Sequence, residues 1–160
     1  MSLKMIPADI SYLEPGEKRI ANKLNSLYLN VDYDCYLYVQ PRLKQLNPDF
    51  LLIDTYKGIC IIEVKDWDIS YIKRIYSTYI VDVRGRRRHN PVFRTNQYFN
   101  FAKRTLQSEP YFIDENGFFK LKLYSKVIFL NLNAKDVESL NPYLYQPTLV
   151  QNLVIFVFFD

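Results

Sequence analysis

The feature that most constrains this chain is the stretch at residues 47–67, which reads NPDFLLIDTYKGICIIEVKDW. Two apolar runs, residues 49–54 and residues 59–65, flank a tight turn that contains Gly58. Short apolar runs that are separated by a glycine turn predict a β-hairpin. We therefore expect two adjacent antiparallel strands that are largely buried.

Three charged residues lie at the ends of these strands. Asp49 begins the first strand, and Glu63 and Lys65 end the second on one shared face, because strand side chains alternate. Asp49 and Glu63 both fall at the end of the hairpin away from the turn, so their carboxylates can converge. Charges on a buried strand are costly unless something compensates them.

A divalent cation would compensate these charges. Two carboxylates and one backbone carbonyl form a hard oxygen site suited to Mg²⁺ or Mn²⁺. The metal would acidify a water molecule, and Lys65 would either orient that water or stabilise the charge that develops on a phosphate. Simpler interpretations remain open: Glu63 and Lys65 as a solvated ion pair, and Asp49 as a turn residue after Pro48. The combination of all three favours a nuclease site.

The composition is that of a globular protein. The chain has 160 residues, 49% hydrophobic and 24% charged, which excludes a disordered chain and predicts one domain over residues 1–160. The net charge of +4 permits an acidic partner such as nucleic acid without requiring one. No apolar run is long enough for a membrane span, and the N-terminus lacks the apolar core of a signal peptide. Cys35 and Cys60 fit no zinc pattern, so we expect reduced, buried thiols in a cytoplasmic protein.

The remaining patterns alternate between helices and strands. A helix is predicted after Pro15 and another after Asn90, the latter with Asn as N-cap and Pro at the first position. Strands are predicted at residues 34–40, in several short pieces at 71–83, at 126–132 and at 149–159, with a basic loop at 84–89 and a short helix at 134–140. The expected fold class is α/β, with a central mixed sheet flanked by helices. The late apolar strand also suggests that the natural protein continues and that this chain is its N-terminal part.

The order of these motifs resembles the NERD (nuclease-related) domain of the PD-(D/E)xK nuclease superfamily. The resemblance covers residues 16–106. It rests on Gly16-Glu17 at a helix start, Pro48-Asp49, Gly58-Ile59, Ile62-Glu63-Val64-Lys65 with Trp67, and Asn90-Pro91 before a helix that bears a glutamine. It implies a restriction-endonuclease-like αβββαβ core. It also implies that Glu17, Asp49, Glu63, Lys65 and a helix glutamine are catalytic.

The helix motif departs from the family pattern. The family places its glutamine soon after Asn-Pro, but three residues after Pro91 this chain has Arg94. Gln97 lies one turn later on roughly the same face, and we assign the catalytic role to it. If neither Arg94 nor Gln97 can take the role of the family's glutamine, we expect the nuclease activity to be weakened or lost. Gln97 as a plain surface residue, and Glu17 as a carboxylate that only favours the helix dipole, remain alternatives.

Basic residues near this helix suggest a DNA-binding surface. Its expected members are Arg84, Arg86, Arg87, Arg88 and Arg94. A charge run of this kind is also compatible with a solvated loop. The expected function is metal-dependent hydrolysis of DNA, with a helicase region or partner elsewhere. The alternatives are a weak or inactive nucleic-acid-binding module of a larger DNA-processing protein, and a purely structural domain.

Overall fold

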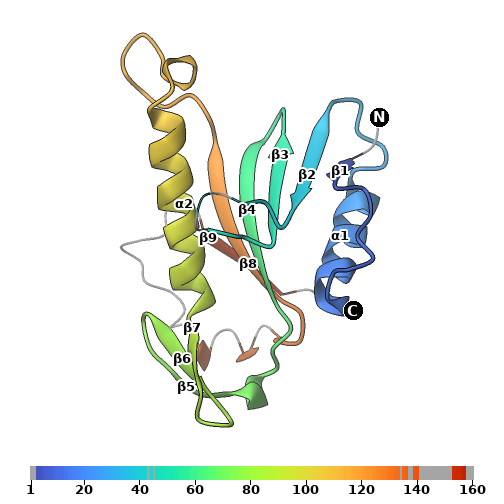
Figure 1. Ribbon diagram of the computed structural model, residues 1–160, viewed down its shortest axis with the longest axis vertical. Coiled ribbons are helices and arrows are strands. Elements are labelled where there is room, and N and C mark those ends of the chain that lie inside the picture. The colour runs from blue at the N-terminus through green and yellow to red at the C-terminus, as the bar shows by residue number, and fades with distance from the viewer. Residues whose placement is uncertain are drawn as a thin grey trace.

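The computed structural model describes residues 3–42, 44, 46–133, 135–136, 139–140 and the strand at 153–157. Two long helices, α1 (Pro15–Leu27) and α2 (Pro91–Gln107), lie on opposite faces of a central sheet (Figure 1). The strands of that sheet are β1 (Lys4–Ile6), β2 (Cys35–Val39), β3 (Phe50–Asp54), β4 (Gly58–Lys65), β8 (Leu123–Phe129) and β9 (Leu153–Val157). The predicted fold class, a mixed sheet flanked by helices, is confirmed.

The central sheet is mixed in strand direction. Its order is β1-β2-β3-β4-β8-β9, and β3 is antiparallel to both of its neighbours, β2 and β4. β8 pairs parallel to β4, and β9 pairs parallel to β8. The crossover from β4 to β8 carries α2, as parallel neighbours require. Along the chain, α1, β2, β3, β4, α2 and β8 reproduce the expected αβββαβ order.

Each face of the sheet has its own apolar core. On the α1 face, Ile20 and Ala21 of the helix pack with Phe50, Ile62 and Val64 of the strands. On the α2 face, one cluster contains Ile61, Tyr98 and Leu123, and another contains Val92, Val127, Phe129 and Leu132. β4 and β8 are covered on both faces, which explains their nearly continuous apolar sequences.

A second, three-stranded sheet joins β4 to α2. It consists of β5 (Ile72–Ile75), β6 (Tyr79–Asp82) and β7 (Arg87–His89), in that order, and lies where α2 begins (Figure 1). Asn90 fixes the junction. Its Oδ1 accepts a hydrogen bond from the Val92 amide at 3.0 Å, which confirms the predicted N-cap. Its Nδ2 donates to the Tyr76 carbonyl at 2.9 Å, and its amide donates to the Thr78 carbonyl at 3.1 Å.

The predicted loop at residues 84–89 is wrong in its second half, because Arg87–His89 form β7 and pair with β6. The short strand β1 was also not expected. The predicted helix at 134–140 is helical at the four positions described, and residues 141–152 lie outside the described residues. No helix among the described residues combines the length and the apolar character that crossing a bilayer requires.

Candidate active site

The hairpin places Asp49 and Glu63 opposite each other. Phe50 pairs with Ile62, so the next antiparallel position joins Asp49 to Glu63 on the face that α2 covers. Asp49 is held there by its Oδ2, which accepts a hydrogen bond from the Val64 amide at 2.6 Å. The two carboxylates therefore converge at the end of the hairpin away from Gly58.

Lys65 reaches back to both carboxylates. Its Nζ donates to Glu63 Oε1 at 2.7 Å and to the Val64 carbonyl at 2.9 Å. The same nitrogen lies 3.9 Å from Asp49 Oδ2. One ammonium group is thus surrounded by three oxygen atoms, and these are the two carboxylates and the backbone carbonyl of the predicted metal site.

Glu63 carries the strongest sign of a functional role. It is only 5% exposed, and its Oε2 is buried without a hydrogen-bond partner in the part of the chain described. Burial raises the pKa of Glu63 above its usual value, against the opposing effect of Lys65, and the charge of Asp49 raises it further. Burial likewise raises the pKa of Asp49, against Lys65 and the Val64 amide. Buried carboxylates with raised pKa values are typical of functional sites.

These oxygen donors fit a divalent cation. An orphaned, buried carboxylate oxygen beside a second carboxylate and a carbonyl is the kind of donor set that Mg²⁺ or Mn²⁺ accepts, with water as further ligands. Among the described residues no group of three or more His, Cys, Asp or Glu side chains is arranged as a metal cluster. The oxygen donors that could hold a metal here are those of Asp49, Glu63 and the Val64 carbonyl.

Glu17 approaches the same site from α1. The first turn of α1 comes very close to the sheet, because a Cβ on Gly16 would lie 2.6 Å from Leu130 Cδ1. Glu17 Oε2 accepts a hydrogen bond from Gln40 Nε2 at 3.0 Å, and the Gln40 amide donates to the Asp49 carbonyl at 2.8 Å. Burial and the charge of Asp49 raise the pKa of Glu17. Gln40, which sequence reasoning missed, thus links the Glu17 carboxylate to the backbone of Asp49.

The α2 residues differ from the sequence assignment. Gln97 is exposed on α2, so the structure does not bring it to the carboxylates. Arg94 is partly buried, and Glu63 and Asp49 both contribute to raising its pKa, after the larger effect of a hydrogen bond with Tyr98. Position 98 comes one helical turn after position 94. Around the helix axis, it points closer to the direction of position 94 than position 97 does. The residues beside the site are therefore Arg94 and Tyr98.

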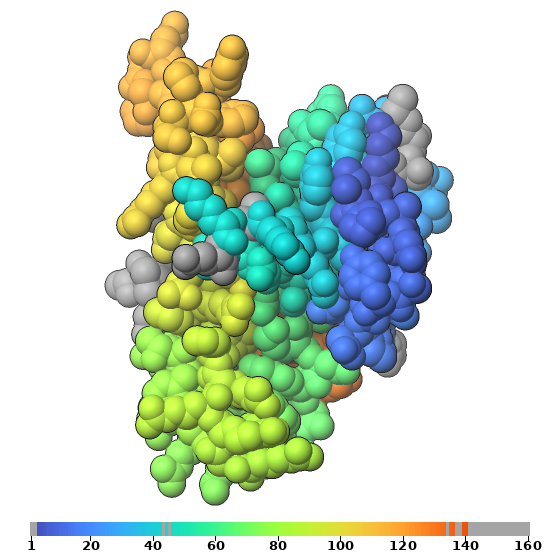
Figure 2. All heavy atoms as spheres, in the orientation of Figure 1, coloured from blue at the N-terminus to red at the C-terminus, as the bar shows by residue number. Residues whose placement is uncertain are grey.

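A groove of about 680 Å³ opens beside these residues. It runs between β4, the small sheet and the start of α2, which form the lower part of the view in Figure 2. Its lining contains Glu63, Lys65, Trp67, Thr78, Tyr79, Arg87, Arg88, His89, Pro91, Phe93 and Arg94. The groove is thus lined by several cationic groups and has a buried carboxylate at one end.

Two residues, Asp82 and Tyr79, contact the arginines that border the groove. Asp82 is fully buried, and its Oδ2 lies 3.1 Å from Arg86 Nε and 3.6 Å from Arg88 Nε. Although burial raises the pKa of Asp82, hydrogen bonds from Arg86 and Arg84 lower it more. Arg87 points the other way and lies 4.7 Å over the ring of Tyr79. Arg86, Arg87 and Arg88 thus have side-chain partners, and Arg87 and Arg88 lie on a strand where a loop was expected.

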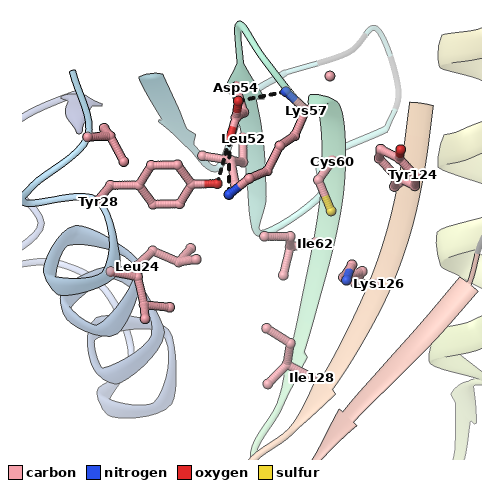
Figure 3. A pocket seen from close by; sticks show the side chains of 13 residues that line it. Leu24, Tyr28, Leu52, Asp54, Lys57, Cys60, Ile62, Tyr124, Lys126 and Ile128 are labelled. Carbon is pink, nitrogen blue, oxygen red and sulfur yellow. Dashed lines mark hydrogen bonds and ion pairs between the residues drawn. The ribbon is translucent and has the colours of Figure 1, made fainter. Parts of the chain in front are cut away.

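A second cavity lies on the opposite, α1 face of the sheet (Figure 3). It has a volume of about 640 Å³ and is largely apolar, with Leu24, Leu52, Cys60, Ile62 and Ile128 among its lining residues. At its rim, Asp54 accepts hydrogen bonds from the Tyr28 hydroxyl at 2.9 Å and from the amides of the β3–β4 turn. Asp54 therefore closes the turn. This pocket contains none of the residues of the candidate active site.

The αβββαβ topology is the one expected of a restriction-endonuclease-like fold. Residues 13–157 match the family described as nuclease-related domain, NERD, so the chain belongs to that family. A crystal structure of a repair endonuclease from Pyrococcus abyssi is also similar, with 14% sequence identity and a TM-score of 0.43. The similarity covers 91% of this chain and 48% of that one, so this chain spans about half its length. A search of curated proteins found no match.

Proposed function

We propose that this chain is a metal-dependent nuclease that hydrolyses DNA phosphodiester bonds. The observation that carries the proposal is Glu63 Oε2, which is buried and without a hydrogen-bond partner among the described residues, beside Asp49 and the Val64 carbonyl. Burying a carboxylate oxygen without a hydrogen-bond partner destabilises the folded protein. A cation bound to that oxygen would offset this cost. A bound Mg²⁺ or Mn²⁺ would acidify a water molecule and screen the phosphate.

The remaining roles in the proposed reaction are assigned to side chains of this protein. Asp49 and Glu63 would hold the metal, and Glu17 would add negative charge next to Asp49. Lys65 donates hydrogen bonds to the phosphate oxygens as negative charge develops on them. Arg87 and Arg88 at the groove wall contact the DNA backbone, where cationic side chains supply affinity without sequence preference.

The test is cleavage of single- and double-stranded DNA by the full chain with Mg²⁺ or Mn²⁺, beside a direct titration with Mn²⁺. The parent should cleave, and Glu63→Gln, which keeps the side-chain volume, should bind Mn²⁺ weakly and cleave at least 100-fold more slowly, about the effect of losing one key catalytic interaction. Lys120→Ser, a change at an exposed position outside the groove, is the matched control. Cleavage that is undiminished in Glu63→Gln would refute the assignment of the site.

The second candidate function is a nucleic-acid-binding module with a weak or inactive site. The observation that favours it is the exposure of Gln97 together with the cationic Arg94 beside the carboxylates. DNA binding without cleavage under any divalent metal would select this function over the first.

A further inference from the structure

Tyr98 is a fully buried polar residue that connects two parts of the candidate active site. It is 1% exposed, and its ring packs with Ile61 and Leu123. Its hydroxyl accepts a hydrogen bond from Arg94 Nε and donates one to the Asn47 carbonyl at 3.3 Å. Asn47 lies two residues before Asp49. One hydroxyl group therefore joins the loop that leads into Asp49 to the helix that carries Arg94.

Arg94 is held at the groove by this connection. Its guanidinium carbon lies 5.6 Å from the centre of the Tyr98 ring, and its Nε–H is used by the Tyr98 hydroxyl. A guanidinium has four further N–H donors on its terminal nitrogens. Arg94 lines the groove together with Glu63 and Lys65. A cation whose position is fixed next to two carboxylates is well suited to receive an anionic group that these carboxylates would otherwise repel.

We propose that Arg94 binds a non-bridging oxygen of the substrate phosphodiester and that Tyr98 is the positioning residue that fixes Arg94 for this contact. The inference rests on the proposed nuclease function. The guanidinium fork matches phosphate geometry, and a side chain that is already ordered loses less conformational entropy when it binds. Because the Tyr98 hydroxyl also bonds to Asn47, one group contributes to the positions of both Arg94 and Asp49. The side chain that contacts the phosphate and the carboxylate that would hold the metal thereby keep a fixed position relative to each other.

A purely structural role predicts different results from the proposed one. If Arg94 only neutralises Glu63 and Asp49, its loss changes stability and leaves the affinity for DNA and its salt dependence unaltered. If Tyr98 only fills the core, Tyr98→Phe, which keeps the ring, has little effect on either reaction rate or affinity.

The experiment is a double-mutant cycle with Arg94→Gln and Tyr98→Phe in the full chain. Single-turnover cleavage is measured with Mn²⁺ at saturating DNA, and DNA affinity is measured by fluorescence anisotropy in EDTA over a series of salt concentrations. Arg94→Gln should slow cleavage about 100-fold and reduce the log–log salt slope by about 0.7 to 0.9. Tyr98→Phe should slow cleavage about tenfold with a nearly unchanged slope, because the charge remains but is misplaced. The double variant should be no slower than Arg94→Gln alone.

Two outcomes overturn the proposal. In the first, Arg94→Gln leaves both the rate and the salt slope unchanged. In the second, Tyr98→Phe slows the Arg94→Gln variant by the same factor as it slows the parent, which would show that the two residues act independently. If the parent does not cleave, the nuclease function fails and the cycle is read on DNA affinity alone. Coupling of the two residues in affinity then supports the Arg94–phosphate contact, and its absence refutes it.

Matched controls separate these effects from general changes in charge and stability. Arg104→Gln removes an arginine from the exposed last turn of the same helix, about 15 Å along its axis from Arg94. Tyr111→Phe removes the hydroxyl of a tyrosine that is 86% exposed. Both should cleave and bind as the parent does. Thermal unfolding of each variant shows whether the fold is retained.

Discussion

The ammonium nitrogen of Lys65 lies 2.7 Å from Oε1 of Glu63, while Oε2 of the same carboxylate has no hydrogen-bond partner among the described residues. A cation is therefore already present among the oxygens that would hold a metal, and it is attached to the chain. Under the proposed function, Glu63 would hold the metal in place of this ammonium. Lys65 then becomes available to the phosphate.

Lys65→Met should strengthen Mn²⁺ binding and abolish cleavage. Methionine has a side chain of similar length to that of lysine, but it lacks the ammonium charge that competes with the metal. A hydrogen bond to a charged group contributes about 1.5–3 kcal/mol, so the affinity should rise by about 10- to 100-fold. Isothermal titration with Mn²⁺ measures the first effect, and a single-turnover cleavage assay measures the second. A weaker affinity would mean that Lys65 supports metal binding instead of opposing it.

Glu63→Gln should raise the stability of the metal-free protein near neutral pH. Because the pKa of Glu63 is raised in the folded state, the folded protein holds the proton more tightly than the unfolded chain. This stabilisation is complete below the unfolded pKa of about 4.3 and is lost as the pH rises through the folded pKa. Glutamine cannot lose a proton, so its advantage should grow from pH 5 to pH 8. Each kcal/mol gained should raise the unfolding midpoint by about 2–4 °C.

Asp82→Asn should show the opposite pH dependence. The pKa of Asp82 is lowered in the folded state, so its contribution to stability is present above the unfolded pKa and is lost as the pH falls. The variant should be less stable than the parent at pH 7, with the difference shrinking toward pH 3. Denaturant unfolding across this range measures both effects. Parallel pH profiles for the Asp82 and Glu63 variants would contradict the opposite shifts.

Gly58→Ala should be much more destabilising than Gly85→Ala. Both glycines have positive φ angles, +108° and +76°. A Cβ at position 58 would also lie 2.2 Å from the Lys122 carbonyl oxygen, whereas at position 85 nothing lies within 4 Å. We expect a loss of about 3 kcal/mol or more at position 58 and about 1 kcal/mol at position 85. Urea unfolding measures both, and equal losses would mean that the close approach to Lys122 costs little.

Replacing Arg84, Arg86, Arg87 and Arg88 together by Ser should flatten the salt dependence of DNA binding by about two to four log–log units if most of them contact phosphates. Arg87→Ser alone should account for about 0.9 unit, because Arg87 lines the groove and has no ion pair with Asp82 among the bonds described. Lys120→Ser is the control. An unchanged slope in the fourfold variant would show that the surface has no part in binding DNA.

The hairpin and the capped helix could be predicted from the sequence because their signals are local. Asp49, Glu63 and Lys65 sit at fixed offsets from the Gly58 turn, and Asn90-Pro91 marks the start of α2 by its own chemistry. The family match supports the same motifs. In these elements the chain positions alone determine which side chains share a face.

The residues that sequence reasoning missed depend on contacts between distant segments. Tyr98 bonds to a carbonyl 51 residues earlier, and nothing around Tyr98 in the sequence indicates it. Residue type favours Gln97 over Arg94 for the catalytic role, but the helix turns Gln97 to solvent. β7 consists of exposed, charged residues, and it becomes a strand through its pairing with β6 and the buried carboxylate of Asp82.

The hydrogen bonds made by the side chain and the amide of Asn90 determine where this protein can tolerate an insertion. Its side chain and amide tie the start of α2 to the two residues Tyr76 and Thr78, so the base of the small sheet and the helix move as one body. The tip of the same sheet, at Gly85, has open space around it. Extra residues inserted at that tip would extend the basic surface outward without shifting Arg94. Under the proposed function, the reach of the molecule along a nucleic acid would be adjustable independently of its chemistry.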